Sequence, residues 1–185
     1  NNDNIYVSTD DDEIINVVEN YGLKIPFKRP LELAKDETPS EDAIFHAINF
    51  YEKNHGKLDS VILLQPTSPL RTARHLREAI NLYNKKTNMV VSVTKEEVNL
   101  FSKTFKEIKD GFPKKLIPDT IDTTTVYNYN GAIYIINVDA LKKYKKLPLF
   151  DKIVEYEMEK TNSIDIDDLS DWLMAEQILE NKLNK

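Results

Sequence analysis

Residues 60–71 read SVILLQPTSPLR, an apolar run over 60–64 followed by a polar turn between Pro66 and Pro69 that ends at Arg71. A continuous apolar run of this length is typical of a strand buried on both faces of a sheet. Proline cannot donate to a strand ladder, so the strand should end before Pro66 and the chain should turn. The stretch therefore predicts a buried strand, a stiff polar turn and a helix after Arg71.

Strand and helix patterns alternate on both sides of this stretch. Apolar runs rich in β-branched residues predict strands over 5–9, 60–64, 89–93, 132–136 and 163–167. Apolar residues at helical spacing predict helices between them and one at the C-terminus, with an inward face of Leu169, Trp172, Leu173, Leu179 and Leu183. The alternation indicates a single α/β domain over residues 1–185, with a mainly parallel sheet. Residues 95–126 are rich in Lys and Thr, lose the alternation and are expected to protrude.

Two helix starts are marked by their capping residues. The acidic run over 10–13 suits a helix N-terminus, where the helix dipole favours negative charge. Further along, Thr38 can cap a helix, Pro39 suits its first position and Glu41 completes a capping box. We therefore expect helices to begin near Asp10 and near Thr38.

The composition excludes several classes of function. With no cysteine, the chain has no disulfide, no thiol nucleophile and no Cys-ligated zinc, which favours a reducing compartment. A net charge of −6 argues against coating a nucleic acid. No apolar run approaches the ~18 residues of a membrane span. The four glycines are scattered, so these residues contain no glycine-rich phosphate loop.

Ligands of open α/β sheets bind beyond the carboxyl ends of the strands. The segments at such ends are 8–10, 65–71, Ser92 and 165–167. The 65–71 turn concentrates an amide, two hydroxyls and a guanidinium between two prolines, and such a turn can present hydrogen-bonding groups to a ligand. Alternatively, its Ser and Thr side chains only cap the next helix.

Asp165 and Asp167 are two positions apart on an expected strand, so their carboxylates would share one face. Their Cα atoms would be about 7 Å apart, and hard oxygen ligands at that separation can flank one Mg²⁺ ion. The alternative is an edge strand with Ile164 and Ile166 inward and two solvated acids outward. His46, His55 and His75 lack metal-ligand spacing and are interpreted as ordinary surface or helix residues.

Five segments together resemble one family: IYVSTDDDEI, KRPLELAKDETPSEDAIFHAI, LLQPTSPLRTARHL, NGAIYI and SIDIDDLSDWLMAEQIL. The chain resembles the acylneuraminate cytidylyltransferases, also called CMP-sialic acid synthetases, and their legionaminate-activating relatives. The resemblance implies a cytoplasmic enzyme with a Rossmann-like, three-layer nucleotidyltransferase fold. That enzyme would transfer CMP from CTP to a nonulosonic acid, a nine-carbon 2-keto sugar acid such as sialic or legionaminic acid, and release pyrophosphate. It would bind neither nucleic acid nor membrane.

The resemblance also implies roles for single residues. Arg29, Thr38 and Ser40 would lie against the cytosine of CTP. Gln65 and Tyr134 would contact the sugar acid, and Gln65 would be one of the catalytic residues.

Asp165 and Asp167 would be the other catalytic residues, because they would hold the Mg²⁺ cofactor that the resemblance implies. The protruding segment 95–126 would form a homodimer, and Lys103 would supply a cation across that interface.

The chain departs from the family pattern in two places. The family begins with a strand, a phosphate-binding loop and a helix, which corresponds to roughly 30–40 residues expected upstream of Asn1. Where the family usually has arginines before the NGAIYI segment, residues 119–129 read DTIDTTTVYNY. An alternative hypothesis follows, in which the chain is a catalytically incompetent, truncated relative that acts as a binding or assembly subunit.

Overall fold

The computed structural model describes residues 4–100 and 122–183. The chain divides into two compact units, the first of residues 1–63, 83–90 and 134–154 and the second of residues 64–82, 91–133 and 155–185. Three strands contain residues of both units.

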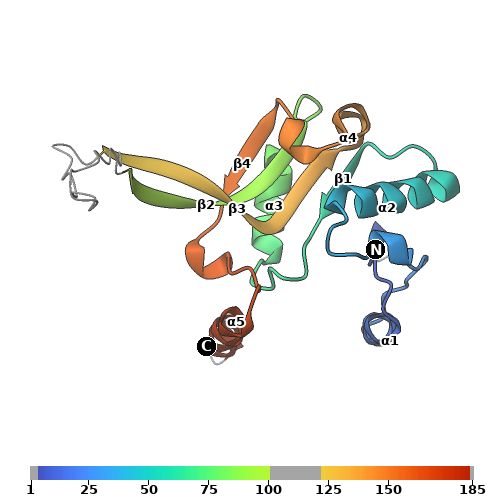
Figure 1. The fold of residues 1–185 in the computed structure, drawn as a ribbon, viewed down its shortest axis with the longest axis horizontal. Helices are drawn as coiled ribbons and strands as arrows, with labels where there is room; N and C mark the ends of the chain where they lie inside the picture. The colour runs from blue at the N-terminus through green and yellow to red at the C-terminus, as the bar shows by residue number, and fades with distance from the viewer. Residues whose placement is uncertain (1–3, 101–121, 184–185) are drawn as a thin grey trace, which may run out of the picture. The chain divides into compact units, whose positions relative to one another are not determined.

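The described residues form one sheet whose strands are hydrogen-bonded in the order β1-β3-β2-β4 (Figure 1). The strands are β1 (Ser60–Leu63), β2 (Met89–Leu100), β3 (Asp122–Asn137) and β4 (Ile153–Glu157). β1 pairs antiparallel with β3, with Leu63 opposite Tyr134. Bonds from Met89 N to Lys152 O and from Met158 N to Val93 O place β4 parallel to β2. The predicted α/β class is confirmed, and the sheet is mixed because β3 runs opposite to its neighbours.

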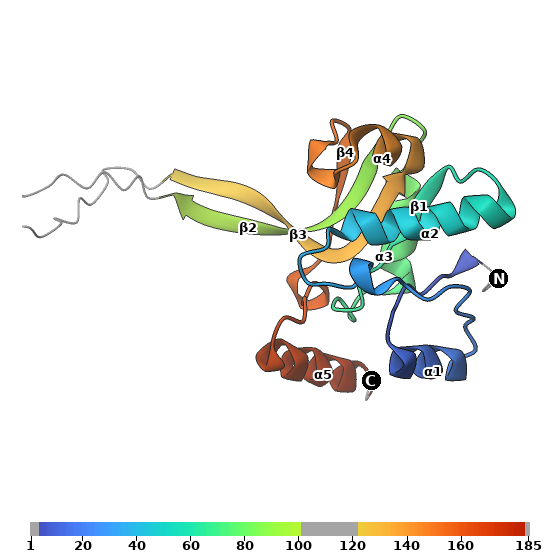
Figure 2. The same ribbon diagram turned by 45° about the vertical axis from the view of Figure 1, so that its right-hand side comes forward.

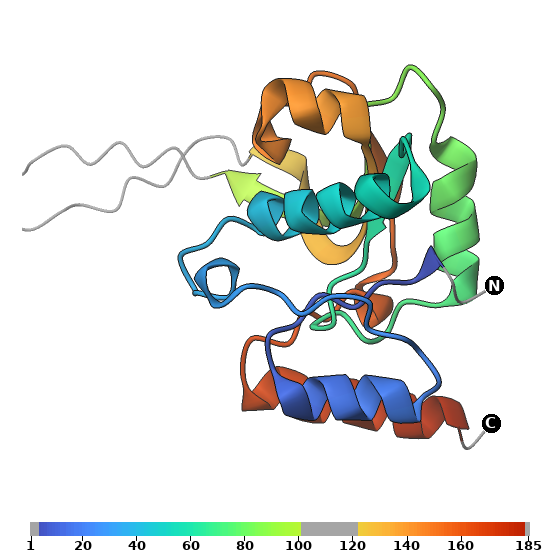
Figure 3. The same cartoon turned by 90° about the vertical axis from the view of Figure 1, so that its right-hand side faces the viewer.

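The first unit contains β1, one end of each of β2, β3 and β4, and several helices. These are α1 (Asp12–Asn20), the 3₁₀ helix η2 (Leu31–Leu33), α2 (Ser40–His55), α4 (Val138–Tyr144) and the 3₁₀ helix η3 (Leu147–Leu149). Asp11 caps α1, because its Oδ1 accepts from the amides of Glu13 and Ile14. α4 runs beside α2 (Figure 3), where Lys142 Nζ lies 2.7 Å from Glu52.

The second unit holds the helices α3 (Ala73–Leu82), η4 (Lys160–Asn162, 3₁₀) and α5 (Leu169–Leu183). Its core is formed by the buried side chains of Leu70, Ala79, Val91, Val93, Ala132, Ile133, Tyr156, Met158 and Ala175. The outer parts of β2 and β3 extend as a two-stranded ribbon (Figure 2). Residues 101–121 of the predicted protruding segment lie outside the described residues.

Two predicted strands are wrong and one strand was not predicted. Residues 5–9 form no strand, since strand propensity acts only through pairing and packing. Residues 163–167 are also irregular, because their polar groups bond to turns: Ile166 N donates to Thr67 O at 2.8 Å. β4 (Ile153–Glu157) is the strand that the pattern analysis missed.

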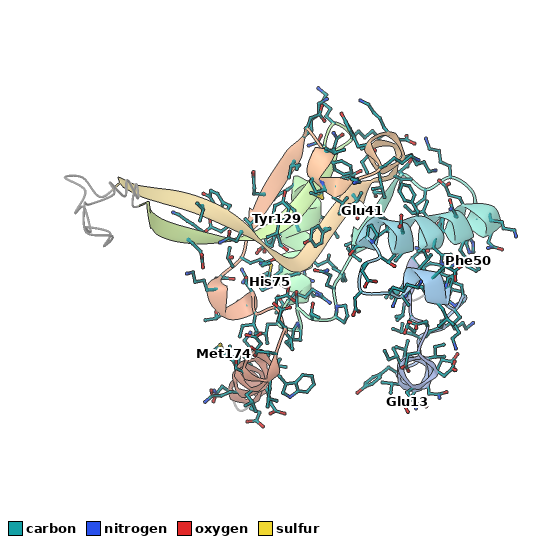
Figure 4. All side chains as sticks on the ribbon, viewed as in Figure 1. Glu13, Glu41, Phe50, His75, Tyr129 and Met174 are labelled. Atoms are coloured by element: carbon teal, nitrogen blue, oxygen red, sulfur yellow. The ribbon has the colours of Figure 1, made fainter. Side chains whose placement is uncertain are left out.

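Several burial predictions are corrected as well. β1 is not buried on both faces, since Ile62 is 38% exposed. The predicted inward face of α5 is wrong, because Leu169, Trp172, Leu173 and Leu179 are exposed and Ala175 is buried. Met174, labelled in Figure 4, is exposed on the same helix. No helix of the described residues is both long and apolar enough to cross a membrane.

His75 was interpreted as an ordinary surface or helix residue, and the structure places it in a helix with its side chain buried. It is 1% exposed and lies on α3 (Figure 4). Its Nδ1 accepts from the amide of Thr72 at 3.1 Å, which makes it a capping group at the start of α3. Burial and the neighbouring Arg74 lower the pKa of His75.

Candidate active site

The polar turn after β1 is held in shape by Arg71. Its Nη1 donates to the carbonyl oxygens of Gln65 at 2.6 Å, Ser68 at 2.8 Å and Ala132 at 3.2 Å. Burial lowers the pKa of Arg71. The guanidinium that the sequence analysis assigned to the turn as a hydrogen-bonding group therefore ties this turn to Ala132 of β3.

A buried hydrogen-bond network lies beneath the turn. Asn130 is 4% exposed, and its Oδ1 accepts from Ser92 Oγ at 2.5 Å and from Ala132 N at 3.2 Å. Its Nδ2 donates to Ser163 Oγ at 2.9 Å. The network thereby links β2, β3 and the segment that leads to Asp165. Sequence reasoning missed Asn130, although it stands in the NGAIYI segment that carried the resemblance.

Three polar side chains converge on Gly131. A Cβ atom placed on Gly131 would lie 2.6 Å from Gln65 Oε1, 3.0 Å from Ser68 Oγ and 3.1 Å from Asp165 Oδ2. The residue has a φ of +72°, in the left-handed region that favours glycine. The structure thus brings Gln65 and Asp165, two of the predicted site residues, to one point in the second unit.

The two predicted metal ligands differ in their surroundings. Asp165 Oδ1 is buried and has no hydrogen-bond partner among the described residues. Asp167 is exposed, and its amide donates to Asp171 Oδ2 at 3.1 Å, just before α5 begins. They lie on an irregular segment, so the strand argument for a shared face is wrong. Within residues 4–100 and 122–183, no group of three or more acidic or histidine side chains is placed to hold a metal.

Arg29 belongs to the first unit, where it joins two segments. Its amide donates to Thr9 O at 2.8 Å, and its Nη2 lies 3.4 Å from Asp10 Oδ1. The rings of Tyr6 and Phe27 stack beside this contact, with centroids 6.2 Å apart. The Nε of Arg29 is buried and has no hydrogen-bond partner among the described residues.

Thr38 and Ser40 also lie in the first unit, and the predicted capping box is wrong. Pro39 is the N-cap of α2 and Ser40 is its first residue. The Thr38 hydroxyl donates to Glu32 O at 3.2 Å instead of capping α2. Glu41 accepts from the amide of Leu147 at 3.0 Å, which draws it away from the helix start.

Tyr134 is the last of the predicted residues in the first unit, on β3 opposite Leu63 of β1. That it forms one site with Gln65 stays a prediction. Lys103 lies outside the described residues.

An open hollow of about 600 Å³ in the first unit contains no predicted site residue. It is lined by Asp42, Phe45, Asn49, Lys142 and Lys145. Lys145 Nζ lies 5.0 Å from the centre of the Phe45 ring, and Lys142 is paired with Glu52. These contacts satisfy the two lysines within the protein, so we place the candidate site around Gly131.

Residues 1–178 match the family model described as cytidylyltransferase. The chain belongs to the cytidylyltransferase family. The resemblance identified from the sequence is thereby confirmed, and the α/β fold of the chain agrees with it. A crystal structure of 4-diphosphocytidyl-2C-methyl-D-erythritol synthase from Anaerococcus prevotii superimposes with a TM-score of 0.59 at 16% identity. The match covers 92% of this chain and 77% of that one, and it shows a shared fold.

The curated relatives include proteins of several bacteria. The chain is 33% identical to an N-acylneuraminate cytidylyltransferase of Escherichia coli, over 96% of this chain and 42% of the relative. It is 28% identical to a CMP-N,N′-diacetyllegionaminic acid synthase of Legionella pneumophila, over 95% of this chain and 78% of the relative. A Streptococcus agalactiae N-acylneuraminate cytidylyltransferase is 29% identical, over 91% of this chain and 41% of the relative. The chain thus spans less than half of the E. coli and S. agalactiae relatives.

Proposed function

We propose that the full-length protein transfers CMP from CTP to a nonulosonic acid of the sialic or legionaminic acid class and releases pyrophosphate. The observation that carries the proposal is the convergence of Gln65 Oε1 and Asp165 Oδ2 on Gly131. Gln65 lies two residues after the end of β1, at a strand end of the kind where open α/β sheets bind ligands. The names of the relatives supply the substrate class.

The proposed reaction is an in-line displacement at phosphorus. The anomeric hydroxyl oxygen of the sugar acid attacks the α-phosphorus of CTP, and a new oxygen–phosphorus bond forms. The bond from the α-phosphorus to the oxygen bridging to the β-phosphorus breaks, pyrophosphate leaves with that electron pair, and the hydroxyl proton passes to solvent. Holding two anions in line is the main task of the protein in such a transfer.

The side chains of this chain would divide that task. Gln65 and Tyr134 would orient the sugar acid through their amide and hydroxyl groups. Arg29, Thr38 and Ser40 would lie against the cytosine. The buried Arg29 Nε without a partner among the described residues and the Thr38 hydroxyl, whose oxygen can still accept, fit polar contacts to a base.

Asp165 and Asp167 would hold a Mg²⁺ ion. Carboxylate oxygens are ligands that Mg²⁺ prefers, and the buried Asp165 Oδ1 without a hydrogen-bond partner among the described residues fits such a ligand. When bound, the ion would neutralise charge on the phosphate oxygens. Asp165 would meanwhile keep its other carboxylate oxygen beside Gly131 and Gln65.

The remaining roles concern assembly. Segment 95–126 would join two copies into a homodimer in the cytoplasm, and Lys103 of one copy would supply a cation to the active site of the other. This proposal rests on the resemblance.

Pyrophosphate release tests the proposed function. The full-length protein would be incubated with CTP, Mg²⁺ and, separately, N-acetylneuraminate, N,N′-diacetyllegionaminate or ketodeoxyoctonate. We expect release with at least one of the two nonulosonic acids, and none when UTP replaces CTP. Absence of release with both nonulosonic acids would overturn the proposal, and release with ketodeoxyoctonate alone would replace the substrate class.

A further inference from the structure

Any residue other than glycine at position 131 would bring its Cβ atom into collision with the side chain of Gln65 as it now stands. Real Cβ atoms essentially never lie as close as 2.6 Å to another heavy atom, and that is the distance to Gln65 Oε1. Two other glycines have similar backbone angles but open surroundings. Gly22 has a φ of +79° and Gly56 a φ of +88°, and an added Cβ on either would meet nothing within 4 Å.

The neighbours of Gly131 differ in their freedom to move. Ser68 is fully buried, and its Oγ donates to Asn130 O at 3.1 Å. Asp165 is followed by Ile166, whose amide is bonded to Thr67 O at 2.8 Å. Gln65 instead meets Gly131 with the far end of a long, flexible side chain. The closest overlap of a methyl group on Gly131 would therefore be relieved by rotation of Gln65, whereas Ser68 and Asp165 would have to give by only a few tenths of an ångström.

We propose that Gly131 is a positioning residue, whose missing side chain leaves the space in which the amide of Gln65 stands beside the carboxylate of Asp165. In the reaction proposed above, on which the kinetic part of this inference rests, Gly131 acts on the sugar acid through Gln65. Gly131 thus allows the backbone of β3 to adopt a positive φ and also leaves room for the side chain of Gln65.

A spectroscopic experiment tests the placement without any substrate. The side-chain amide resonance of Gln65 would be assigned by its loss in Q65A and followed in G131A and in the matched control G22A. We expect it to shift in G131A and to stay in place in G22A. Both variants should lose about 2–8 °C of Tm through backbone strain at positive φ. An unmoved Gln65 resonance in folded G131A would overturn the proposal.

Kinetics then test the role of that placement. G131A should lower kcat/KM for the sugar acid by about 10- to 100-fold, the range for losing a hydrogen bond to a charged ligand, while G22A should not. In a Q65A background, adding G131A should change kcat/KM by less than about 2-fold, because the two changes act through one side chain. Independent, multiplicative losses would contradict the proposal.

Failure of the proposed function is distinguishable from failure of this inference. If the wild type turns over no nonulosonic acid, the resonance shift alone decides the role of Gly131. If G131A does not fold, the double variant G131A/Q65A should fold, since the 2.6 Å overlap is gone and the contacts of 3.0 Å with Ser68 and 3.1 Å with Asp165 require the neighbours to give by only a few tenths of an ångström. Misfolding of the double variant as well would show a purely structural glycine and overturn the proposal.

Discussion

Arg71 donates from Nη1 to the carbonyl oxygen of Ala132 at 3.2 Å, although the two residues are 61 positions apart in the chain. The same nitrogen donates to Gln65 O and Ser68 O. One guanidinium therefore joins the turn after β1 to Ala132 of β3, next to Gly131, and the placement of Gln65 beside Gly131 depends on that junction.

Replacing this arginine should destabilise the fold. R71Q removes the donor from three backbone carbonyls, so we expect the free energy of unfolding to fall by about 2–4 kcal/mol in urea titrations. The matched control is R77Q on the exposed side of α3, which should change it by no more than about 0.5 kcal/mol. Equal losses in both variants would show that the Arg71 bonds contribute little.

Asn130 and Asn128 form a natural pair on β3, one buried and one exposed. N130A removes a hydrogen-bond partner from Ser92, Ala132 and Ser163, and should cost about 2–4 kcal/mol of unfolding free energy. N128A removes only the exposed bond to Glu96 and should cost less than about 1 kcal/mol. Urea unfolding measures both, and a larger loss for N128A would contradict the network.

His75 should make stability depend on pH. Because burial lowers its pKa in the folded protein, protonation favours the unfolded state. The stability from neutral His75 is complete above the unfolded pKa of about 6.5 and is lost as the pH falls below it, with a limiting slope of about 1.4 kcal/mol per pH unit. H75N should flatten this dependence between pH 7.5 and 5, whereas H55N, at the exposed end of α2, should not. A wild-type curve that H75N leaves unchanged would exclude His75 as its source.

Substitution of Asp165 or Asp167 should lower activity without lowering the stability of the fold. D165N and D167N should each lower kcat/KM by about 100-fold or more and change the Mg²⁺ dependence. Neither should lower Tm, because Asp165 Oδ1 has no hydrogen-bond partner among the described residues and Asp167 is exposed. E176Q, on an exposed position of α5, is the control that leaves the Mg²⁺ dependence unchanged. Unaltered kinetics in D167N would leave Asp167 as a solvated residue.

Much of α1, α2 and β2 could be read from local patterns, since α1 begins after Asp11 of the acidic run and α2 and β2 follow their apolar residues. The C-terminal helix was predicted, but its buried face was not. Trp172, Leu173 and Met174 are consecutive and cannot share one face, and the small Ala175 is the buried residue. A local sequence pattern therefore shows that a helix forms more readily than it shows which side of that helix packs against the rest of the protein.

The candidate site was predictable only in part for a similar reason. Gln65 and Asp165 were identified, whereas Asn130 and Gly131 were not assigned roles. Their importance lies in contacts with residues more than 30 positions away, such as Asn130 with Ser92 and Ser163. An alternating pattern at 163–167 suggested a strand, but a local bond from Ser163 Oγ to Glu159 O and a tertiary bond from Ile166 N to Thr67 O hold that segment in an irregular shape.

Formation of a CMP-sugar by wild-type protein and by Q65A tests the central claim most directly. With CTP, Mg²⁺ and a nonulosonic acid, the wild type should form one CMP-nonulosonate for each pyrophosphate released. Q65A should raise the KM for the sugar acid by about 10-fold or more and change the KM for CTP by less than about 2-fold, while Q177A on α5 should match the wild type. Absence of any CMP-nonulosonate from the wild type would contradict the account.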